Sequence, residues 1–196
     1  MRAAAAAGIA IGPGIAQSAP AMSLTPLPTT PYALFALLHG QCAGDDDLLL
    51  LRSEGSMTRA LARRFGPVRV ERSSEGLVVP RPGEARLLDR RQRGGFWCRE
   101  IKLFAGGRVR LEGRTLAPPD AVRLQRDLRR LEDRPLMDLL FRNDRLRPDV
   151  QRELRLFGSD RRGSLLRGTL FRIRNEPLLL LESLRGLDSQ TSDLCR

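Results

Sequence analysis

The sequence predicts a single α+β domain built on an antiparallel sheet. Two apolar runs, residues 96–104 and 109–117, flank the turn sequence Ala105-Gly106-Gly107-Arg108, which is typical of a β-hairpin. A second pair of apolar runs, residues 164–173 and 178–184, forms the last two predicted strands. Segments with helical signals lie between these pairs. Hairpins with helices inserted between them favour an antiparallel sheet.

The elements before the first hairpin are predicted from their turn and cap residues. An amphipathic helix is expected over residues 32–41, followed by a turn at 45–47 and the apolar run Leu48–Leu51. Ser56 is a good N-cap for a helix over residues 57–65, which Gly66-Pro67 ends.

A short hairpin is expected next, with strands at residues 68–70 and 77–79 joined around residues 73–76. A polar, arginine-rich connection over residues 81–93 then leads to the first long strand.

Proline marks the later helix starts. Pro118-Pro119 precedes a helix that carries Val122, Leu124, Leu128 and Leu131, and Pro135 precedes a helical segment over residues 136–141. Arg147-Pro148-Asp149 is predicted to begin another helix, which ends near Gly158.

Residues 1–30 are predicted to be a disordered, low-complexity extension, and the folded domain is predicted to span residues 31–196. The extension consists mostly of Ala, Gly, Pro and Ser, which cannot bury enough apolar surface to offset the entropy of ordering. Met22 is an alternative start of translation. A secretory signal peptide is the weaker interpretation, because Gly and Pro interrupt the apolar stretch that follows Arg2.

The chain is strongly basic, with 34 Lys and Arg residues against 23 Asp and Glu and a formal net charge of +11. Such a charge ordinarily indicates a nucleic acid or another anionic partner. Here the positive residues are almost all arginine, they are spread among acids, and aromatic residues that could stack on bases are few. We therefore expect no nucleic-acid partner. No segment is apolar for long enough to insert into a membrane.

Cysteine and histidine usage argues against disulfides, metal sites and a Ser-His-Asp mechanism. Cys42, Cys98 and Cys195 are an odd number without metal-ligand spacing, which fits neither a disulfide framework nor a zinc site and favours a reducing, cytoplasmic compartment. The single histidine, His39, is expected to be structural. The sequence also contains no Walker-type loop and no glycine-rich dinucleotide loop, so we expect no metal and no cofactor.

Arg99 is the first candidate for a binding role. Counting outward from the Gly106-Gly107 turn places it directly opposite Arg114 on one face of the hairpin. Opposed like charges are destabilising unless an anion lies between them, and guanidinium groups match carboxylates well. Trp97 and Ile101 share that face by alternation, so it is expected to be half-buried. The alternative is a solvent-facing arginine ladder, and a one-residue register shift would separate the pair.

Two helix starts and one strand-end acid are further candidates. Helices that begin near Met57 and Leu136 offer backbone N–H groups and the positive end of a dipole, which bind carboxylates. The apolar run Pro177–Leu181 ends in Glu182. Burial raises the pKa of a carboxyl group and makes it a candidate proton acceptor. Ordinary helix capping and a solvent-facing Glu182 are the alternatives.

Taken together, these segments resemble the chorismate lyase family, and the resemblance covers roughly residues 46–185. In chain order it rests on Leu48–Leu51 leading to Gly55-Ser56-Met57-Thr58-Arg59, Phe96–Ile101, Gly113-Arg114-Thr115 with Pro118, Pro135-Leu136 with Leu140-Phe141, and Pro177–Glu182. The stretch over residues 163–169 matches the arginine- and serine-rich pattern of the family only loosely.

The resemblance implies a six-stranded antiparallel sheet with helices covering a buried ligand cavity. It also implies a cofactor-free lyase, expected to be a cytoplasmic monomer, that converts chorismate into 4-hydroxybenzoate and pyruvate and so supplies the ring of ubiquinone or plastoquinone. The implied ligand contacts are Met57, Arg99, Leu136 and Glu182, with Arg99 and Glu182 as the catalytic candidates. Arg99 and two backbone amides would hold the ring carboxylate, and Glu182 would meet the ring hydroxyl. Arg114 is assigned to the enolpyruvyl carboxylate.

Two other functions stay open at this point. The effector domains of certain bacterial regulators resemble chorismate lyase in fold, so a non-catalytic domain that binds small carboxylates is one alternative. The N-terminal segment lacks the length and pattern of a helix-turn-helix domain. A basic nucleic-acid-associated protein is the other alternative, and its binding would weaken steeply with salt.

Overall fold

A computed structural model describes residues 23–26, 45–89, 94–143, 145–159 and 164–185. The helix predicted over residues 32–41, with His39, lies outside these residues. The helices are α2 (Asp45–Arg52), α3 (Met57–Phe65), α4 (Pro82–Leu87), α5 (Val122–Arg129) and α6 (Met137–Leu140). The long strands are β2 (Arg69–Val78), β3 (Phe96–Ala105), β4 (Arg108–Ala117), β7 (Val150–Ser159), β8 (Leu165–Ile173) and β9 (Glu176–Leu184), and the short ones are β1 (Ser23–Pro26), β5 (Phe141–Arg142) and β6 (Arg145–Leu146).

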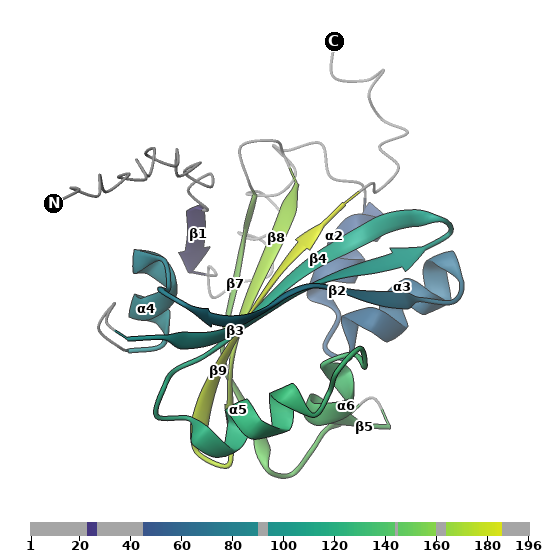
Figure 1. Ribbon diagram of the computed structural model, residues 1–196. Coiled ribbons are helices and arrows are strands. Elements are labelled where there is room, and N and C mark those ends of the chain that lie inside the picture. The colour runs from purple at the N-terminus through teal and green to yellow at the C-terminus, as the bar shows by residue number, and fades with distance from the viewer. Residues whose placement is uncertain (1–22, 27–44, 90–93, 144, 160–163, 186–196) are drawn as a thin grey trace, which may run out of the picture.

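The long strands form the predicted six-stranded antiparallel sheet of an α+β domain, in the spatial order β7-β8-β9-β4-β3-β2. The sheet is strongly twisted, with α2 and α3 beside one end and α5 and α6 beside the other (Figure 1). Strand β1, which falls within the predicted N-terminal extension, pairs with the outer edge of β7. Among the described residues no helix is long and apolar enough to cross a membrane.

Several local predictions are confirmed. The first hairpin turns at Gly106-Gly107, whose φ angles of 58° and 74° lie in the region that glycine adopts without strain. Helix α3 begins after Ser56, whose Oγ accepts a hydrogen bond from the Arg59 N–H, and it ends at Gly66. The last two strands also lie where the sequence predicts them.

Three local predictions are wrong. Residues 45–47 form the first turn of α2 instead of a free turn, and acidic residues are favoured in the first turn of a helix. Residues 69–78 form one edge strand, β2, instead of a hairpin; its exposed polar centre resembles a turn in sequence. Residues 150–159 form strand β7 instead of a helix. The strand is not recognisable in the sequence, because a bulge at Glu153 breaks its two-residue alternation.

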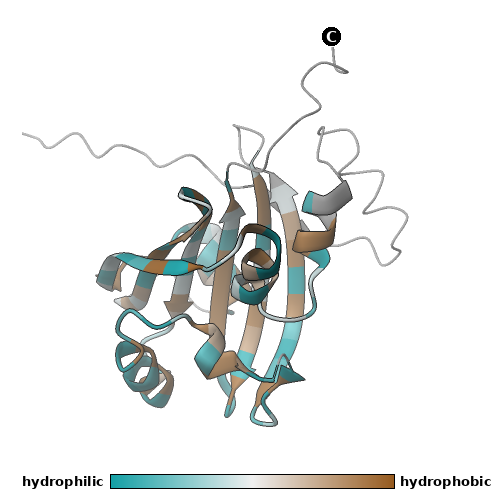
Figure 2. Ribbon diagram, turned by 90° about the vertical axis from the view of Figure 1, so that its right-hand side faces the viewer, coloured by the Kyte–Doolittle hydropathy of each residue, from teal (hydrophilic) through white to brown (hydrophobic). Residues whose placement is uncertain are grey.

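One face of the sheet carries two hydrophobic clusters that leave space between them. At one end, Leu124 and Leu128 of α5 pack with Trp97 and Phe171 of the sheet. At the other end, Leu61 of α3 packs with sheet residues that include Leu103 and Leu111. Figure 2 shows helical segments in front of strands that are hydrophobic along much of their length. The opposite face has its own cluster around Cys98 and Leu116.

Candidate active site

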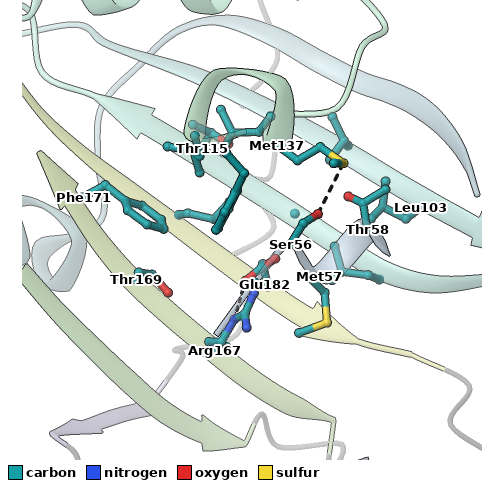
Figure 3. A pocket seen from close by; sticks show the side chains of 18 of the residues that line it. Ser56, Met57, Thr58, Leu103, Thr115, Met137, Arg167, Thr169, Phe171 and Glu182 are labelled. Atoms are coloured by element: carbon teal, nitrogen blue, oxygen red, sulfur yellow. Dashed lines mark hydrogen bonds and ion pairs between the residues drawn. The ribbon is translucent and has the colours of Figure 1, made fainter. Parts of the chain in front are cut away.

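A pocket lies between these two clusters, on the face of the sheet that α3 and α6 cover. Its walls come from the start of α3, the segment 136–141 and the inward-facing residues of five strands (Figure 3). The lining residues are Gly55, Ser56, Met57, Thr58, Ile101, Leu103, Leu111, Gly113, Thr115, Leu136, Met137, Leu140, Phe141, Arg152, Arg155, Arg167, Thr169, Phe171, Leu180 and Glu182.

The structure brings Met57, Leu136 and Glu182 together in this pocket. All three are buried, with 3%, 6% and 6% of their surface exposed. Arg99 and Arg114 are not among the lining residues. The pocket therefore contains three of the five predicted site residues.

The starts of α3 and α6 lie next to each other across the pocket. The Ser56 Oγ contacts the Met137 Sδ at 3.3 Å, which joins the N-cap of one helix to the first residue of the other (Figure 3). Helix N-termini have backbone N–H groups without partners inside the helix. The segments around Met57 and Leu136 thus place two such N-termini at the same cavity.

Glu182 lies on the pocket side of β9, between Arg167 of β8 and Gly113 of β4. Its Oε2 accepts a hydrogen bond from the Nε of Arg167 and forms an ion pair with the Nη2 of the same side chain, each at 2.6 Å (Figure 3). Because Gly113 has no side chain, the other side of the carboxylate borders the cavity. A fixed carboxylate with open space beside it can accept a hydrogen bond from a ligand hydroxyl.

Arg99 is 1% exposed and lies on the same face as the pocket, directly opposite the pocket residue Thr115. Its Nη2 donates to the backbone oxygens of Glu132 and Arg134, the latter at 2.9 Å. Within the described residues its buried Nε has no acceptor. Burial lowers the pKa of Arg99, and an anion placed against the Nε would offset that cost. Arg99 therefore holds the loop before Leu136, and its role in ligand binding stays a prediction.

The predicted pairing of Arg99 with Arg114 is wrong. The cross-strand partner of Arg114 is Glu100, so Arg99 and Arg114 lie on opposite faces of the sheet. The cause is a bulge near the turn, where Arg110 is an extra residue in β4 and its guanidinium stacks on the Phe65 ring at 4.0 Å. A one-residue shift exchanges the two faces of a strand.

Arg114 forms a separate ion-pair group on the other face. Its Nε donates to Glu84 at 2.8 Å and its Nη1 to Glu100 at 2.7 Å. Burial acts to lower the pKa of Arg114, but the hydrogen bonds to Glu84 and Glu100 and the charges nearby together outweigh it and raise the pKa above its ordinary value. Arg114 thus has carboxylate partners within the protein, and its assignment to the enolpyruvyl carboxylate stays a prediction.

Sequence analysis missed three arginines that line the pocket, Arg152, Arg155 and Arg167. In a chain with 34 basic residues no single arginine is conspicuous. Alternation along the predicted strand 164–173 could have placed Arg167 on the same face as Phe171 and Ile173. Arg152 and Arg155 were assigned to a helix, so no sequence pattern identified them.

Comparison with known proteins decides the family. The chorismate lyase family model matches residues 47–185, a range that includes every residue lining the pocket. The chain belongs to the chorismate lyase family.

Two relatives of this chorismate lyase family member are named chorismate pyruvate-lyase. One, from Sodalis glossinidius, is 38% identical over 138 residues, which cover 68% of this chain and 73% of the relative. The other, from Escherichia coli, is 35% identical over 142 residues, which cover 69% of this chain and 79% of the relative.

Solved structures match the chorismate lyase domain weakly. The effector domain of PhnF from Mycobacterium smegmatis is 14% identical, with a TM-score of 0.39 over 68% of this chain and 90% of that domain. Within the described ranges, no group of His, Cys, Asp and Glu side chains is arranged to hold a metal ion.

Proposed function

We propose that this protein is a chorismate pyruvate-lyase, which converts chorismate into 4-hydroxybenzoate and pyruvate. Membership of the chorismate lyase family supports this proposal. The single structural observation that carries it is the pocket in which two helix starts, at the buried residues Met57 and Leu136, lie at the same cavity as the carboxylate of Glu182. The 4-hydroxybenzoate supplies the aromatic ring precursor of a quinone such as ubiquinone or plastoquinone.

The reaction is an elimination that makes the ring aromatic. A base removes the proton on ring carbon C4, the C–H electron pair becomes a ring double bond, and the C3–O bond breaks. The leaving oxygen keeps that bond's electron pair, and the resulting enolate of pyruvate takes up one proton on its methylene carbon to give pyruvate. Aromatisation provides the driving force, so the protein contributes orientation and electrostatic stabilisation.

The ring carboxylate is held at the end of the pocket near Arg99. The Nε of Arg99, for which the described part of the chain offers no acceptor, and the backbone amides at the two helix starts provide donors for it. Met57 and Leu136 also contribute apolar walls against the ring. This arrangement orients the ring across the cavity.

Glu182 acts at the other end of the ring. Its carboxylate accepts a hydrogen bond from the 4-hydroxyl, or takes the C4 proton directly, while Arg167 fixes its orientation. Arg167 is thus a positioning residue and Glu182 is the catalytic candidate.

An assay for both products tests this function. Purified protein incubated with chorismate should release equal amounts of pyruvate and 4-hydroxybenzoate. Pyruvate is measured by its coupled reduction with lactate dehydrogenase, and 4-hydroxybenzoate is measured by chromatography. Release of neither product would overturn the proposed function.

Variants of the two catalytic candidates test the residue roles. Arg99→Ala and Glu182→Gln should each lower kcat/KM by about 100-fold or more, which is the typical effect of one positioned acid, base or ion-pairing group. Glu71→Gln, an exposed acid on β2, is the control and should keep normal turnover. Near-normal turnover in both pocket variants would overturn the assignments.

We also propose that the protein acts as a monomer in the cytoplasm without a nucleic-acid partner. Its scattered arginines, many of them paired with acids in the structure, support the last point. Size-exclusion chromatography tests the monomeric state, and a nucleic-acid shift assay at physiological salt tests the absence of a nucleic-acid partner.

A further inference from the structure

Arg152 and Arg155 of β7 lie side by side at the pocket although they are three positions apart. The bulge at Glu153 makes this possible, because it pairs Arg152 with Phe171 and Arg155 with Thr169 on the neighbouring strand. Phe171 and Thr169 both line the pocket. The bulge therefore turns two arginines of one strand toward the same cavity.

The only carboxylate that contacts both arginines among the described residues is that of Glu54. Arg155 Nη1 donates to Glu54 Oε1 at 2.6 Å, and Arg152 Nη1 contacts Glu54 Oε2. The Glu54 side chain is 77% exposed, whereas those of Arg152 and Arg155 are 17% and 14% exposed. An ion pair with so exposed a partner is weak and easily exchanged. Glu54 is thus a displaceable counter-ion for a half-buried pair.

The arginine pair also has unused hydrogen-bonding capacity. The Nε atoms of Arg152 and Arg155 are buried and have no acceptor within the described part of the chain. Burial lowers the pKa of Arg155, and the charges of Arg167 and Arg152 lower it further. Buried donors without acceptors are uncommon and call for an explanation. This end of the pocket is short of negative charge.

Backbone contacts fix both guanidinium groups in place. Arg152 donates to the carbonyl of Glu54, and Arg155 donates to the carbonyl of Ser53, at the segment that follows α2. Two guanidinium groups held in this way form a preorganised site for a planar carboxylate.

We propose that Arg152 and Arg155 bind the enolpyruvyl carboxylate of chorismate, and that Glu54 occupies this subsite in the ligand-free protein. The inference rests on the proposed function, since it concerns the second carboxylate of the same dianionic substrate. The Glu54 carboxylate shows where such a group fits, bridging the two side chains. The ring carboxylate and this second carboxylate are then held by different arginines.

The subsite distinguishes the substrate from the aromatic product. Chorismate has two carboxylates, whereas 4-hydroxybenzoate keeps only the ring carboxylate after pyruvate leaves. Arg152 and Arg155 therefore contribute to the binding of chorismate and not to that of 4-hydroxybenzoate. A merely structural role, such as holding the segment after α2, would affect both ligands alike.

The test compares the two ligands in Arg152→Gln and Arg155→Gln. Each variant should raise the KM for chorismate by about 10-fold or more, the effect of one charged hydrogen-bonding group. The Kd for 4-hydroxybenzoate, measured by calorimetry, should stay within about twofold of the wild-type value. Arg123→Gln, an exposed arginine on α5, controls for the general loss of positive charge and should leave both values unchanged.

Glu54→Gln provides the opposite test. Removal of the competing carboxylate should lower the KM for chorismate severalfold and leave the Kd for 4-hydroxybenzoate unchanged. Equal weakening of both ligands in the arginine variants, or an unchanged KM for chorismate, would overturn the proposal. If the wild-type protein binds 4-hydroxybenzoate but releases no pyruvate from chorismate, the proposed function fails. The subsite would then be judged from the Kd of chorismate in the same variants.

Discussion

Arg167 and Glu182 face each other across β8 and β9 and form a buried ion pair at the pocket. Their side chains are only 6% and 7% exposed, and both Arg167 contacts to the carboxylate measure 2.6 Å. The Nη1 of Arg167 also donates to the backbone oxygen of Ser53 at 3.2 Å. One arginine thus orients the Glu182 carboxylate and ties the end of α2 to the sheet.

Arg167→Leu should destabilise the protein strongly. The substitution leaves the Glu182 carboxylate buried without a partner, and breaking such a pair costs about 3–5 kcal/mol. In a chain of this length that corresponds to a fall in Tm of roughly 6–20 °C. Thermal denaturation followed by circular dichroism measures it.

The double variant Arg167→Leu/Glu182→Leu tests the cause of that loss. With both charges removed, much of the stability should return, because two apolar side chains can fill the space. A double variant as unstable as Arg167→Leu would mean that the backbone contacts of Arg167, and not its ion pair, carry the stability.

Arg99→Lys should weaken ligand binding while it preserves the charge. A lysine ammonium cannot donate to Glu132 and Arg134 with the fixed geometry of a guanidinium, so the loop before Leu136 loses a tether. We expect the Kd for 4-hydroxybenzoate to rise by about 10-fold or more, the range for one charged hydrogen bond. Calorimetry measures this, and wild-type affinity in the lysine variant would show that charge alone is sufficient.

The position of Arg99 relative to Arg114 shows which parts of the site can be predicted from the sequence and which cannot. The hairpin ends were predictable, because Gly106-Gly107 specifies the turn locally. The relation of Arg99 to Arg114 was not, since it depends on the extra residue Arg110, which stacks on Phe65 of a distant helix. Residues on one strand can be assigned to a face from sequence only when no bulge intervenes.

The fold itself could be predicted better than its elements. The predicted hairpin within residues 68–79 is one strand, and the predicted helix over residues 147–158 is another strand. These two errors cancel, so the number of long strands is six as predicted. Met57 and Leu136 could be placed at a ligand site because they lie at predicted helix starts, and Glu182 because it follows an apolar run. The resemblance to the chorismate lyase family supported all three. Arg152 and Arg155 could not be placed at the pocket from the sequence, because a bulge in β7 determines which face of the sheet their side chains lie on.

Gly113→Ala should weaken ligand binding through a local clash. A Cβ at this position would lie 3.0 Å from the Cγ1 of Ile101, and both residues line the pocket beside Glu182. Ile101 must then shift, which narrows the cavity, so we expect the KM for chorismate to rise severalfold. Gly76→Ala on β2 is the matched control, because a Cβ there meets no atom within 4 Å. Equal KM values in both variants would show that the pocket adapts without cost.

Cys98 should resist thiol reagents in the folded protein. It is 2% exposed, and burial raises the pKa of its thiol from 9.0 to about 11. The thiolate is the reactive form, so a raised pKa and burial both slow the reaction at neutral pH. Labelling with an aromatic disulfide should be tested in Cys42→Ser/Cys195→Ser, where Cys98 is the only thiol. We expect slow labelling in buffer and rapid labelling in denaturant, whereas rapid labelling of the native protein would contradict the buried position.

The same shift predicts how Cys98 affects stability at high pH. The unfolded state releases the thiol proton above pH 9.0, while the folded state keeps it until about pH 11. Because the unfolded state then binds fewer protons, the free energy of unfolding falls as the pH rises through this window. Cys98→Ala should remove this part of the decline, so its denaturation midpoint should fall less than that of the wild type between the two pH values. Parallel curves for the two proteins would mean that Cys98 does not titrate differently in the folded and unfolded states.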